Sequence, residues 1–318
     1  MDRRRMLWLA LAGIPTYGLG KEHLPQSLTF TGSRKFSSIM AKAKREGWHK
    51  LPMSTRMARF AKELHGVPYK SFTLEIHDKV ESASVNLEGL DCWTFFEIVL
   101  GLSRMIEGGY YEANKSRLLR EVEFTRYRGG VCHGNYLDRI HYLAEWFFEN
   151  EARGVAVDIT RELGGAKRVY GRDISEMTKL WKSYRYLKNN PSLRAPMAKH
   201  EARVEKLPVY YLPRSRVSSI ESKLQNGDII GAVTKYDGGY CSHVGIVYVD
   251  SSGVRRMMHA STDYRRVVID KSVSGYLYKY SKYLGAIVAR PQPVSKTVLD
   301  PAQYRRNLTK LVRGANGV

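Results

Sequence analysis

Cys92 occupies the position in this chain that most favours chemistry, because it lies at the predicted start of a helix. The apolar residues that follow it recur at helical spacing, at Phe95, Val99, Leu102 and Ile106. Asp91 suits the N-cap of this helix, which places Cys92 in the first turn. Unpaired N–H groups and the helix dipole favour an anion there, and they can lower a thiol pKa from about 8.5 to roughly 3.5–7.5. The spacing therefore predicts a nucleophilic thiolate.

Two histidines, His243 and His259, lie on predicted β-strands that follow one another along the chain. The strands cover 241–249 and 256–261, and the segment 250–253 between them has the composition of a turn. Antiparallel pairing would put one histidine on each of two facing strands. A helix-start cysteine, a histidine base and a second polar residue that orients the imidazole form the triad of a cysteine hydrolase.

Each of these residues also has a purely structural interpretation. An isolated cysteine is most often a small core residue, and a lone strand histidine usually makes structural hydrogen bonds. The combination favours chemistry, because a helix followed by histidine-bearing strands is the order of a papain-like core. The turn Asn226-Gly227-Asp228, which leads into the strand residues Ile229 and Ile230, adds to that order.

Several segments together resemble the NlpC-type cysteine peptidases, and most closely the bacterial N-acetylmuramoyl-L-alanine amidase-like family of that superfamily. The matching segments are Gly66-Val67-Pro68-Tyr69, Thr73-Leu74-Glu75, Val85-Asn86-Leu87, Leu90-Asp91-Cys92-Trp93-Thr94-Phe95, Arg139-Ile140-His141-Tyr142 with Trp146 and Asn150, Asn226-Gly227-Asp228-Ile229-Ile230, Ser242-His243-Val244-Gly245 and His259-Ala260-Ser261. Any one fragment is weak, whereas their order and combination are specific.

The resemblance implies a role for individual residues. Cys92 would be the nucleophile, His243 the base that takes its proton, and His259 the residue that holds the ring of His243. Backbone N–H groups at the start of the Cys92 helix, aided by Tyr69, would meet the oxyanion. The candidate substrate-binding residues are Tyr69, Asp91, Ser242, Arg139 and His141. No metal and no cofactor are expected.

One departure from the NlpC-type motif lies directly beside the nucleophile. The usual motif has serine and glycine after the cysteine, whereas Trp93 and Thr94 follow Cys92 here. The amidase-like branch accepts threonine at the second position, but the bulky Trp93 is expected to reshape the neighbouring pocket. It leaves open a catalytically silent envelope-binding module, and an acyl- or amide-transferring enzyme of the same fold is a further alternative.

Cys132 and Cys241 are the remaining cysteines. They could pair in an exported protein, although spacing cannot establish this, and free packing residues are the simpler interpretation. Because Cys241 precedes His243 by two residues, strand alternation predicts that both side chains share a face. Zinc binding is a minority alternative, since no Cys-x-x-Cys or His-x-x-x-His spacing supports it.

The amino terminus has the features of an export signal. Basic residues, including an Arg3-Arg4 pair typical of twin-arginine signals, precede a short apolar run and small residues up to Gly20. A basic tail on a cytoplasmic protein is the alternative. We expect a signal in 1–20, a single catalytic domain with helical insertions in 21–292, and a C-terminal tail in 293–318. No apolar run is long enough to span a bilayer as a mature helix.

The formal net charge of +21 indicates an anionic partner. Nucleic acid, an anionic membrane surface and an anionic cell envelope all fit this charge. No zinc finger, aromatic ribonucleoprotein signature or recognition-helix pattern supports nucleic acid. Murein peptides carry free carboxylates, so the charge favours peptidoglycan as the partner of a monomeric protein in the periplasm or cell envelope.

The predicted fold class is α+β, with helices first and then a segregated antiparallel sheet. Helices are predicted over 33–65, 137–149 and 174–188, and a basic, proline-punctuated surface excursion over 195–221. Strands are predicted to dominate 228–290. With the resemblance, this indicates an exported peptidoglycan hydrolase. It would cut either the N-acetylmuramoyl-L-alanine bond or the γ-D-glutamyl-diamino acid bond.

Overall fold

The computed structural model describes residues 24–295 and 300–314 of the chain, so the predicted export signal in residues 1–20 lies outside it. The α-helices are α1 (Gln26–Thr29), α2 (Ser33–Arg45), α3 (Met53–Glu63), α4 (Cys92–Glu107), α5 (Lys115–Arg126), α6 (Leu143–Ala152), α7 (Glu176–Lys179), α8 (Arg185–Asn189), α9 (Arg194–Val204), α10 (Arg214–Ile220), α11 (Val273–Lys279) and α12 (Pro301–Gly314). The strands are β1 (Phe30–Thr31), β2 (Val85–Asn86), β3 (Ala156–Asp158), β4 (Lys167–Arg168), β5 (Tyr210–Pro213), β6 (Ile229–Thr234), β7 (Cys241–Val249), β8 (Arg255–Ser261), β9 (Arg266–Ser272) and β10 (Tyr283–Pro291).

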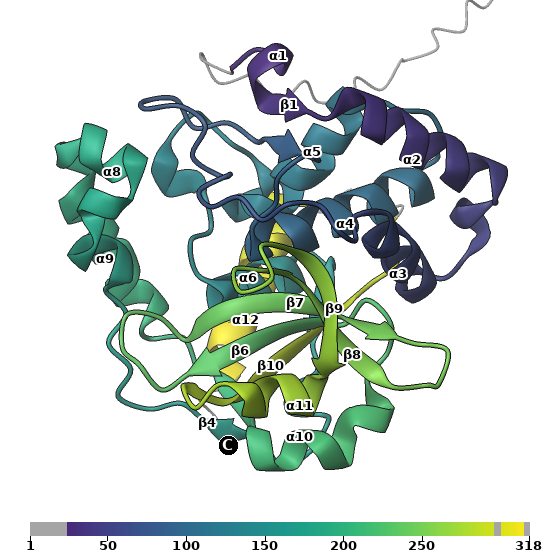
Figure 1. Ribbon diagram of the computed structural model, residues 1–318. Helices are drawn as coiled ribbons and strands as arrows, with labels where there is room; N and C mark the ends of the chain where they lie inside the picture. Colours follow the sequence, from purple (N-terminus) through teal and green to yellow (C-terminus); the bar gives the residue numbers. More distant parts are fainter. Residues whose placement is uncertain (1–23, 296–299, 315–318) are drawn as a thin grey trace, which may run out of the picture.

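An antiparallel sheet of eight strands forms the centre of the molecule, which confirms the predicted α+β class. Its order is β4-β5-β10-β6-β7-β8-β9, and β3 pairs with β10 beside this path. Helices α4, α5 and α6 cover one side of the sheet, and α10 and α11 cover the other (Figure 1). A hydrophobic cluster fills each side, with Val244 and Ile246 facing the first and Val247 the second. The sheet is therefore buried between two layers of helices.

Helix α4 is the buried helix that begins with Cys92. Its residues from Thr94 to Ile106 are all buried, as expected for a helix that is apolar on most of its faces. Its two buried charged residues are paired with α5: Glu97 lies 2.7 Å from Arg126, and Arg104 lies 3.0 Å from Glu121. Packing of α4 between α3, α5 and strand β7 fixes the position of its N-terminus relative to the sheet.

The helix predicted over 137–149 begins later in the structure, at Leu143. A short 3-10 turn, η3 (Tyr136–Asp138), capped by Asn135, precedes an extended segment from Arg139 to Tyr142. Arg139 forms an isolated antiparallel bridge with Tyr127, which holds this segment extended. Of the residues that resemble a family helix motif, Arg139-Ile140-His141-Tyr142 therefore lie just before α6, because the bridge to the chain after α5 outweighs local helical spacing, whereas Trp146 and Asn150 lie within the helix.

Two other predictions for the middle of the chain are wrong in detail. The amphipathic pattern over 174–188 forms α7, the 3-10 turn η4 (Trp181–Ser183) and α8 instead of one helix. The basic segment 195–221 is not a surface excursion, because it contains α9, β5 and α10. Strand β5 pairs with β10 inside the sheet. The strands predicted over 228–290 are confirmed, and the helix α11, which was not predicted, lies between β9 and β10.

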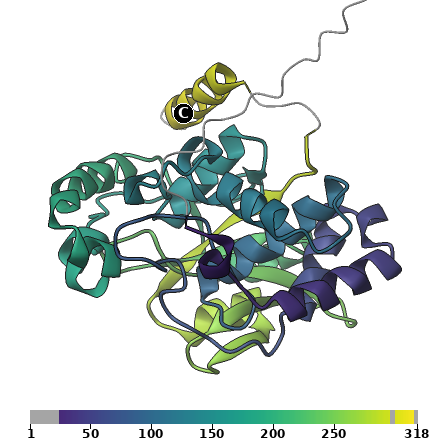
Figure 2. The ribbon, with the colours of Figure 1, turned by 90° about the horizontal axis from the view of Figure 1, so that it is seen from above.

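The C-terminal helix α12 packs against α6 and stands apart from the rest of the molecule when seen from above (Figure 2). The hydroxyl of Tyr304 donates a hydrogen bond of 2.6 Å to Glu149, and the amide of Asn307 donates one of 3.0 Å to the carbonyl of Ala152. Among residues 24–295 and 300–314, no helix has both the length and the apolar character needed to cross a membrane.

Candidate functional site

A cavity of about 300 Å³ lies where the start of α4 meets the first residues of β7. Cys92 and His243 both line it, which brings together the predicted nucleophile and base. Four of the predicted substrate-binding residues also line it: Asp91, Arg139, His141 and Ser242. Tyr69 and His259 are not among the lining residues. The arrangement has a thiol, an imidazole and a hollow for a small part of a substrate.

The start of α4 is fixed by a capping box. The Asp91 carboxylate accepts a hydrogen bond of 2.7 Å from the Thr94 N–H, and the Thr94 hydroxyl contacts the Asp91 N–H at 3.1 Å. The hydroxyl of Thr73 donates a further hydrogen bond of 2.8 Å to the Asp91 carboxylate. The N-cap prediction for Asp91 is confirmed, and the cap places the half-buried Cys92 in the first helical turn.

The thiol of Cys92 is more basic than its helix position alone predicts. Burial and the Asp91 carboxylate raise the pKa of Cys92 to about 12, although backbone hydrogen bonds from Val244 and Trp93 act in the opposite direction. The expectation of a lowered pKa is therefore wrong, because desolvation and an adjacent negative charge outweigh the helix N-terminus. Cys92 is a neutral thiol near pH 7 and needs a base to become a nucleophile.

His243 and His259 form a hydrogen-bonded pair on adjacent strands. Nε2 of His243 lies 2.7 Å from Nδ1 of His259, and the two rings are nearly perpendicular. Tyr276 of α11 packs on both rings, with centroid separations of 5.8 and 4.8 Å. Because Nε2 of His243 takes part in this hydrogen bond, Nδ1 is the ring nitrogen that remains to accept a proton from Cys92.

The imidazole of His243 is neutral near pH 7. Burial lowers its pKa well below the usual value, and the neighbouring His259 and Lys282 lower it further. A neutral imidazole can accept the proton of a neutral thiol, so the pair suits general-base activation of Cys92.

Asp270 on β9 joins the histidines and was not among the residues predicted from the sequence. Its Oδ2 lies 3.5 Å from Nε2 of His259, and both side chains are buried. Interaction with His259 is the largest cause that lowers the Asp270 pKa to about 2. Val268 lies opposite His259 and Ile269 opposite Met258, and Asp270 follows them where the register of the two strands shifts. Asp270 can be identified as a neighbour of His259 only once the pairing register of β8 and β9 is known.

Arg139 and His141 line the cavity but are also held by structural contacts. Arg139 is buried, donates a hydrogen bond of 3.1 Å to Glu75, and lies 3.8 Å from Glu81. His141 lies 3.0 Å from the carbonyl of Tyr136. Burial, followed by Arg139, lowers the pKa of His141 well below its usual value. Both side chains form one wall of the cavity, and substrate contact by either stays a prediction.

Tyr69 lies on the segment that runs beside the start of α4. It bridges Leu90 in parallel, and its N–H donates a hydrogen bond of 2.9 Å to the carbonyl of Arg265. Burial, and then the neighbouring Cys92, raise the pKa of the Tyr69 hydroxyl. Tyr69 is therefore close to the nucleophile as predicted, while contact with substrate or oxyanion stays a prediction.

The three cysteines are free in the structure, so Cys132 and Cys241 are not paired. A bulge where β7 pairs with β6 alters the alternation between Cys241 and His243. Cys241 lines the cavity but packs towards the core cluster that contains Val244. Within the described residues, no group of three or more His, Cys, Asp or Glu side chains could hold a metal ion.

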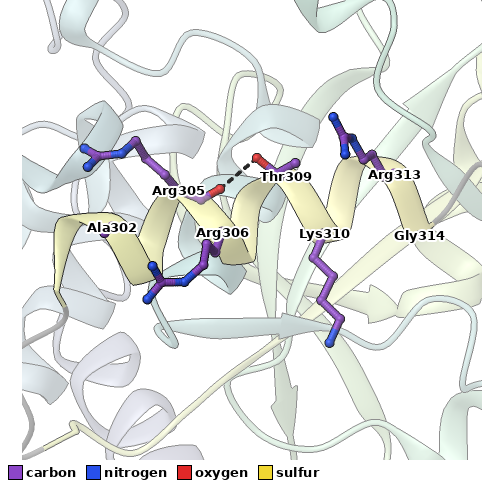
Figure 3. Close-up of a pocket in the computed structure, with 7 residues that line it drawn as sticks. All are labelled: Ala302, Arg305, Arg306, Thr309, Lys310, Arg313 and Gly314. Atoms are coloured by element: carbon purple, nitrogen blue, oxygen red, sulfur yellow. Dashed lines mark hydrogen bonds between the residues drawn. The ribbon is translucent and has the colours of Figure 1, made fainter.

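A second, shallow hollow follows the outer face of α12. Its lining comes entirely from this helix, at Ala302, Arg305, Arg306, Thr309, Lys310, Arg313 and Gly314 (Figure 3). The side chains offer positive charge and include no carboxylate, thiol or imidazole. This surface can attract anions but has no group suited to nucleophilic catalysis.

Comparisons with known structures and proteins place this geometry among related folds. An N-acetylmuramoyl-L-alanine amidase from Bacteroides uniformis is 27% identical, with a TM-score of 0.67 over 76% of this chain and 99% of that chain. Another crystal structure of an enzyme of that name from the same organism gives 28% identity and the same TM-score, over 74% and 98%. A Legionella pneumophila protein, 18% identical with a TM-score of 0.61 over 83% and 98%, shows likeness of fold alone. A comparison with curated proteins gives no significant match.

The family model for AmiA-like, N-acetylmuramoyl-L-alanine amidase-like proteins matches residues 59–284. This match spans the start of α4, the paired histidines and all strands of the sheet from β3 to β9. Because it covers more than half of the chain, the protein belongs to the N-acetylmuramoyl-L-alanine amidase-like family.

Proposed function

We propose that this protein is an exported peptidoglycan hydrolase that cuts an amide bond in the peptide region of murein. The catalytic domain would cover residues 21–292 and have an NlpC-type, papain-like core. One observation carries the proposal: Cys92 and His243 line the same cavity, and His243 lies 2.7 Å from His259. The family supports an amidase, and the triad supports cysteine-dependent chemistry.

The reaction begins with proton transfer from the Cys92 thiol to Nδ1 of His243. The sulfur attacks the amide carbonyl carbon, a C–S bond forms, and the oxyanion is met by N–H groups at the start of α4. The C–N bond then breaks as His243 returns the proton to the leaving amine. Water, deprotonated by His243, hydrolyses the thioester and restores the thiol. His259 holds the ring of His243 throughout, and no cofactor is needed in this sequence.

The family description and the Bacteroides uniformis enzyme support the N-acetylmuramoyl-L-alanine bond as the site of cleavage. The γ-D-glutamyl-diamino acid bond is the alternative within the same substrate. Both are amides in a peptide that carries free carboxylates, to which a chain of net charge +21 is attracted. The shape of the cavity beside Trp93 would decide between them.

Mass spectrometry of purified muropeptides incubated with the protein tests the proposal. We expect loss of one amide with the wild type, and the fragment masses identify the bond. Cys92→Ala and His243→Ala should abolish cleavage, whereas His259→Ala should leave residual activity. Cys132→Ala is the matched control, because it removes a buried thiol outside the cavity. Full activity of Cys92→Ala would refute the mechanism.

Two other functions are distinguished by the same experiment. Trp93 beside the nucleophile and the raised pKa of Cys92 favour a catalytically silent envelope-binding module. Binding of murein without cleavage by the folded wild type would identify it. A transferase of the same fold would release a new amide when an amine acceptor is added.

A further inference from the structure

The hydrogen bond between His243 and His259 can form in two ways, and only one of them permits catalysis. If Nε2 of His243 carries the proton, it donates to Nδ1 of His259, and Nδ1 of His243 keeps a lone pair. If Nδ1 of His259 carries the proton instead, Nε2 of His243 accepts it. A neutral His243 then has its proton on Nδ1 and cannot deprotonate Cys92. The 2.7 Å separation fits both arrangements, so another group must select one.

Asp270 is placed to make this selection. Its Oδ2 lies 3.5 Å from Nε2 of His259, which is the nitrogen that does not face His243. A carboxylate accepts hydrogen bonds and cannot donate them, so it favours a proton on Nε2 of His259. Neutral His259 then has a lone pair on Nδ1, which must accept from His243.

The surroundings of Asp270 keep its carboxylate ionised and in place. The N–H of Lys271 donates a hydrogen bond of 2.8 Å to Oδ1, and Nζ of Lys279 on α11 lies 3.4 Å from Oδ2. Lys279 is shared with Asp263, at 3.6 Å. The side chains of Asp270 and His259 are only 4% and 1% exposed, so little water competes for their contact.

We propose that Asp270 is a positioning residue that, through His259, fixes the tautomer in which Nδ1 of His243 is the free base. The chain of contacts then runs from the Asp270 carboxylate to His259 Nε2–H, and from His259 Nδ1 to His243 Nε2–H. During amide cleavage no proton moves to Asp270, because the proton from the Cys92 thiol stays on His243 until the amine leaves. This role deepens the proposed function, since it concerns the base of the same site.

The other charged and titratable groups around the histidine pair do not suit this role. Lys279, Lys271 and Lys282 are cations, which cannot accept a hydrogen bond from His259, and the ring of Tyr276 meets that of His259 in a T-shaped contact. Asp263 contacts Lys279 and Tyr280. Cys92 and Asp91 lie on the cavity side of His243. Among the described residues, Asp270 alone is a carboxylate that an ion-pair contact joins to His259.

The first test uses the wild-type protein and needs no substrate. Nitrogen-15 NMR of selectively labelled histidine distinguishes protonated ring nitrogens from those with a lone pair. We expect protonated Nε2 and unprotonated Nδ1 in both His243 and His259 near neutral pH. A proton on Nδ1 of His259 in the wild type would overturn the proposal, whether or not the protein cleaves murein.

The second test compares Asp270→Asn with Asp263→Asn, which removes a neighbouring carboxylate that contacts Lys279 and Tyr280. We expect Asp270→Asn to shift the ring proton of His259 between its two nitrogens. It should also slow the alkylation of Cys92 by iodoacetamide near neutral pH, which mass spectrometry of the Cys92 peptide measures. Its kcat/KM should fall roughly 10- to 100-fold, as for outer groups that orient a histidine. Asp263→Asn should match the wild type.

The outcomes separate the two proposals. If the wild type does not cleave murein, the NMR signals and the alkylation rate still test the role of Asp270. If Asp270→Asn folds and keeps wild-type alkylation rate and histidine signals, Asp270 is not the positioning residue. If that variant does not fold, the wild-type spectrum decides alone.

Discussion

At the scale of single residues, the site combines a neutral thiol with a neutral imidazole. The pKa of Cys92 is raised to about 12 and that of His243 is lowered, in each case first of all by burial. Both shifts oppose a preformed thiolate–imidazolium pair, because burial favours the uncharged form of each group. The thiolate would therefore form only as His243 takes the proton during the reaction, and near neutral pH the free thiol would react slowly with water-borne electrophiles.

The reactivity of Cys92 as a function of pH follows from these shifts. A thiol with a raised pKa should be alkylated by iodoacetamide at a rate that keeps increasing from pH 7 to about pH 10. Amide cleavage should be constant near neutral pH and fall only in acid, where His243 becomes protonated below its usual pKa. Peptide mass spectrometry measures the alkylation rate. A plateau that begins below pH 7 would instead indicate a preformed ion pair.

At the scale of elements, the start of α4 links stability to chemistry. Asp91 caps the helix, accepts a hydrogen bond from Thr73, and raises the pKa of Cys92 by its negative charge. The same carboxylate therefore stabilises the helix and makes the nucleophile harder to ionise. The cap on α5 provides a comparison, because Asn114 accepts a hydrogen bond of 2.9 Å from the N–H of Arg117 without touching the cavity.

Asp91→Ala should lower the free energy of unfolding by about 1–2 kcal/mol through loss of the cap. It should also lower the pKa of Cys92, because the adjacent negative charge is gone. Urea unfolding and the pH dependence of Cys92 alkylation measure the two effects.

Asn114→Ala is the matched control for this substitution. It should cost about 1 kcal/mol in urea unfolding and leave the alkylation profile unchanged. An unchanged profile in Asp91→Ala would show that the carboxylate does not control the thiol.

At the scale of the whole molecule, positive charge is the dominant surface property. The net charge is +21, and the outer face of α12 carries Arg305, Arg306, Lys310 and Arg313 without an acidic residue between them (Figure 3). This helix is held against α6 by its other face. Its cations, of which Arg306 also lies 3.8 Å from Asp300, are exposed at a place separate from the cavity.

Binding to purified peptidoglycan should weaken as salt rises from about 0.1 M to about 1 M, because screening shortens the range of these charges. We expect the triple variant Arg305→Ala, Lys310→Ala, Arg313→Ala to bind less in a sedimentation assay while cleaving soluble muropeptides normally. The matched triple variant carries Lys199→Ala, Arg203→Ala and Lys206→Ala, which are exposed on and after α9. Equal weakening by both triples would assign the attraction to overall charge instead of α12.

The sequence alone predicted a substantial part of this molecule. Helical spacing after Cys92 and the cap residue Asp91 located the start of α4, because those signals lie within a few residues of one another. The composition of 241–249 and 256–261, with a turn between them, predicts β7 and β8, and the resemblance to the family links Cys92 to His243. The α+β class followed from the order of these elements.

Only the tertiary structure decided the long-range features. The extended segment at Arg139, the insertion of β5 into the sheet and the bulge beside Cys241 depend on partners far away in the chain. The raised pKa of Cys92 depends on how deeply the helix start is buried, and the contact of Asp270 with His259 depends on strand register. Local spacing fixes which side chains are present at an element, whereas desolvation and cross-strand contacts exist only after the chain has packed.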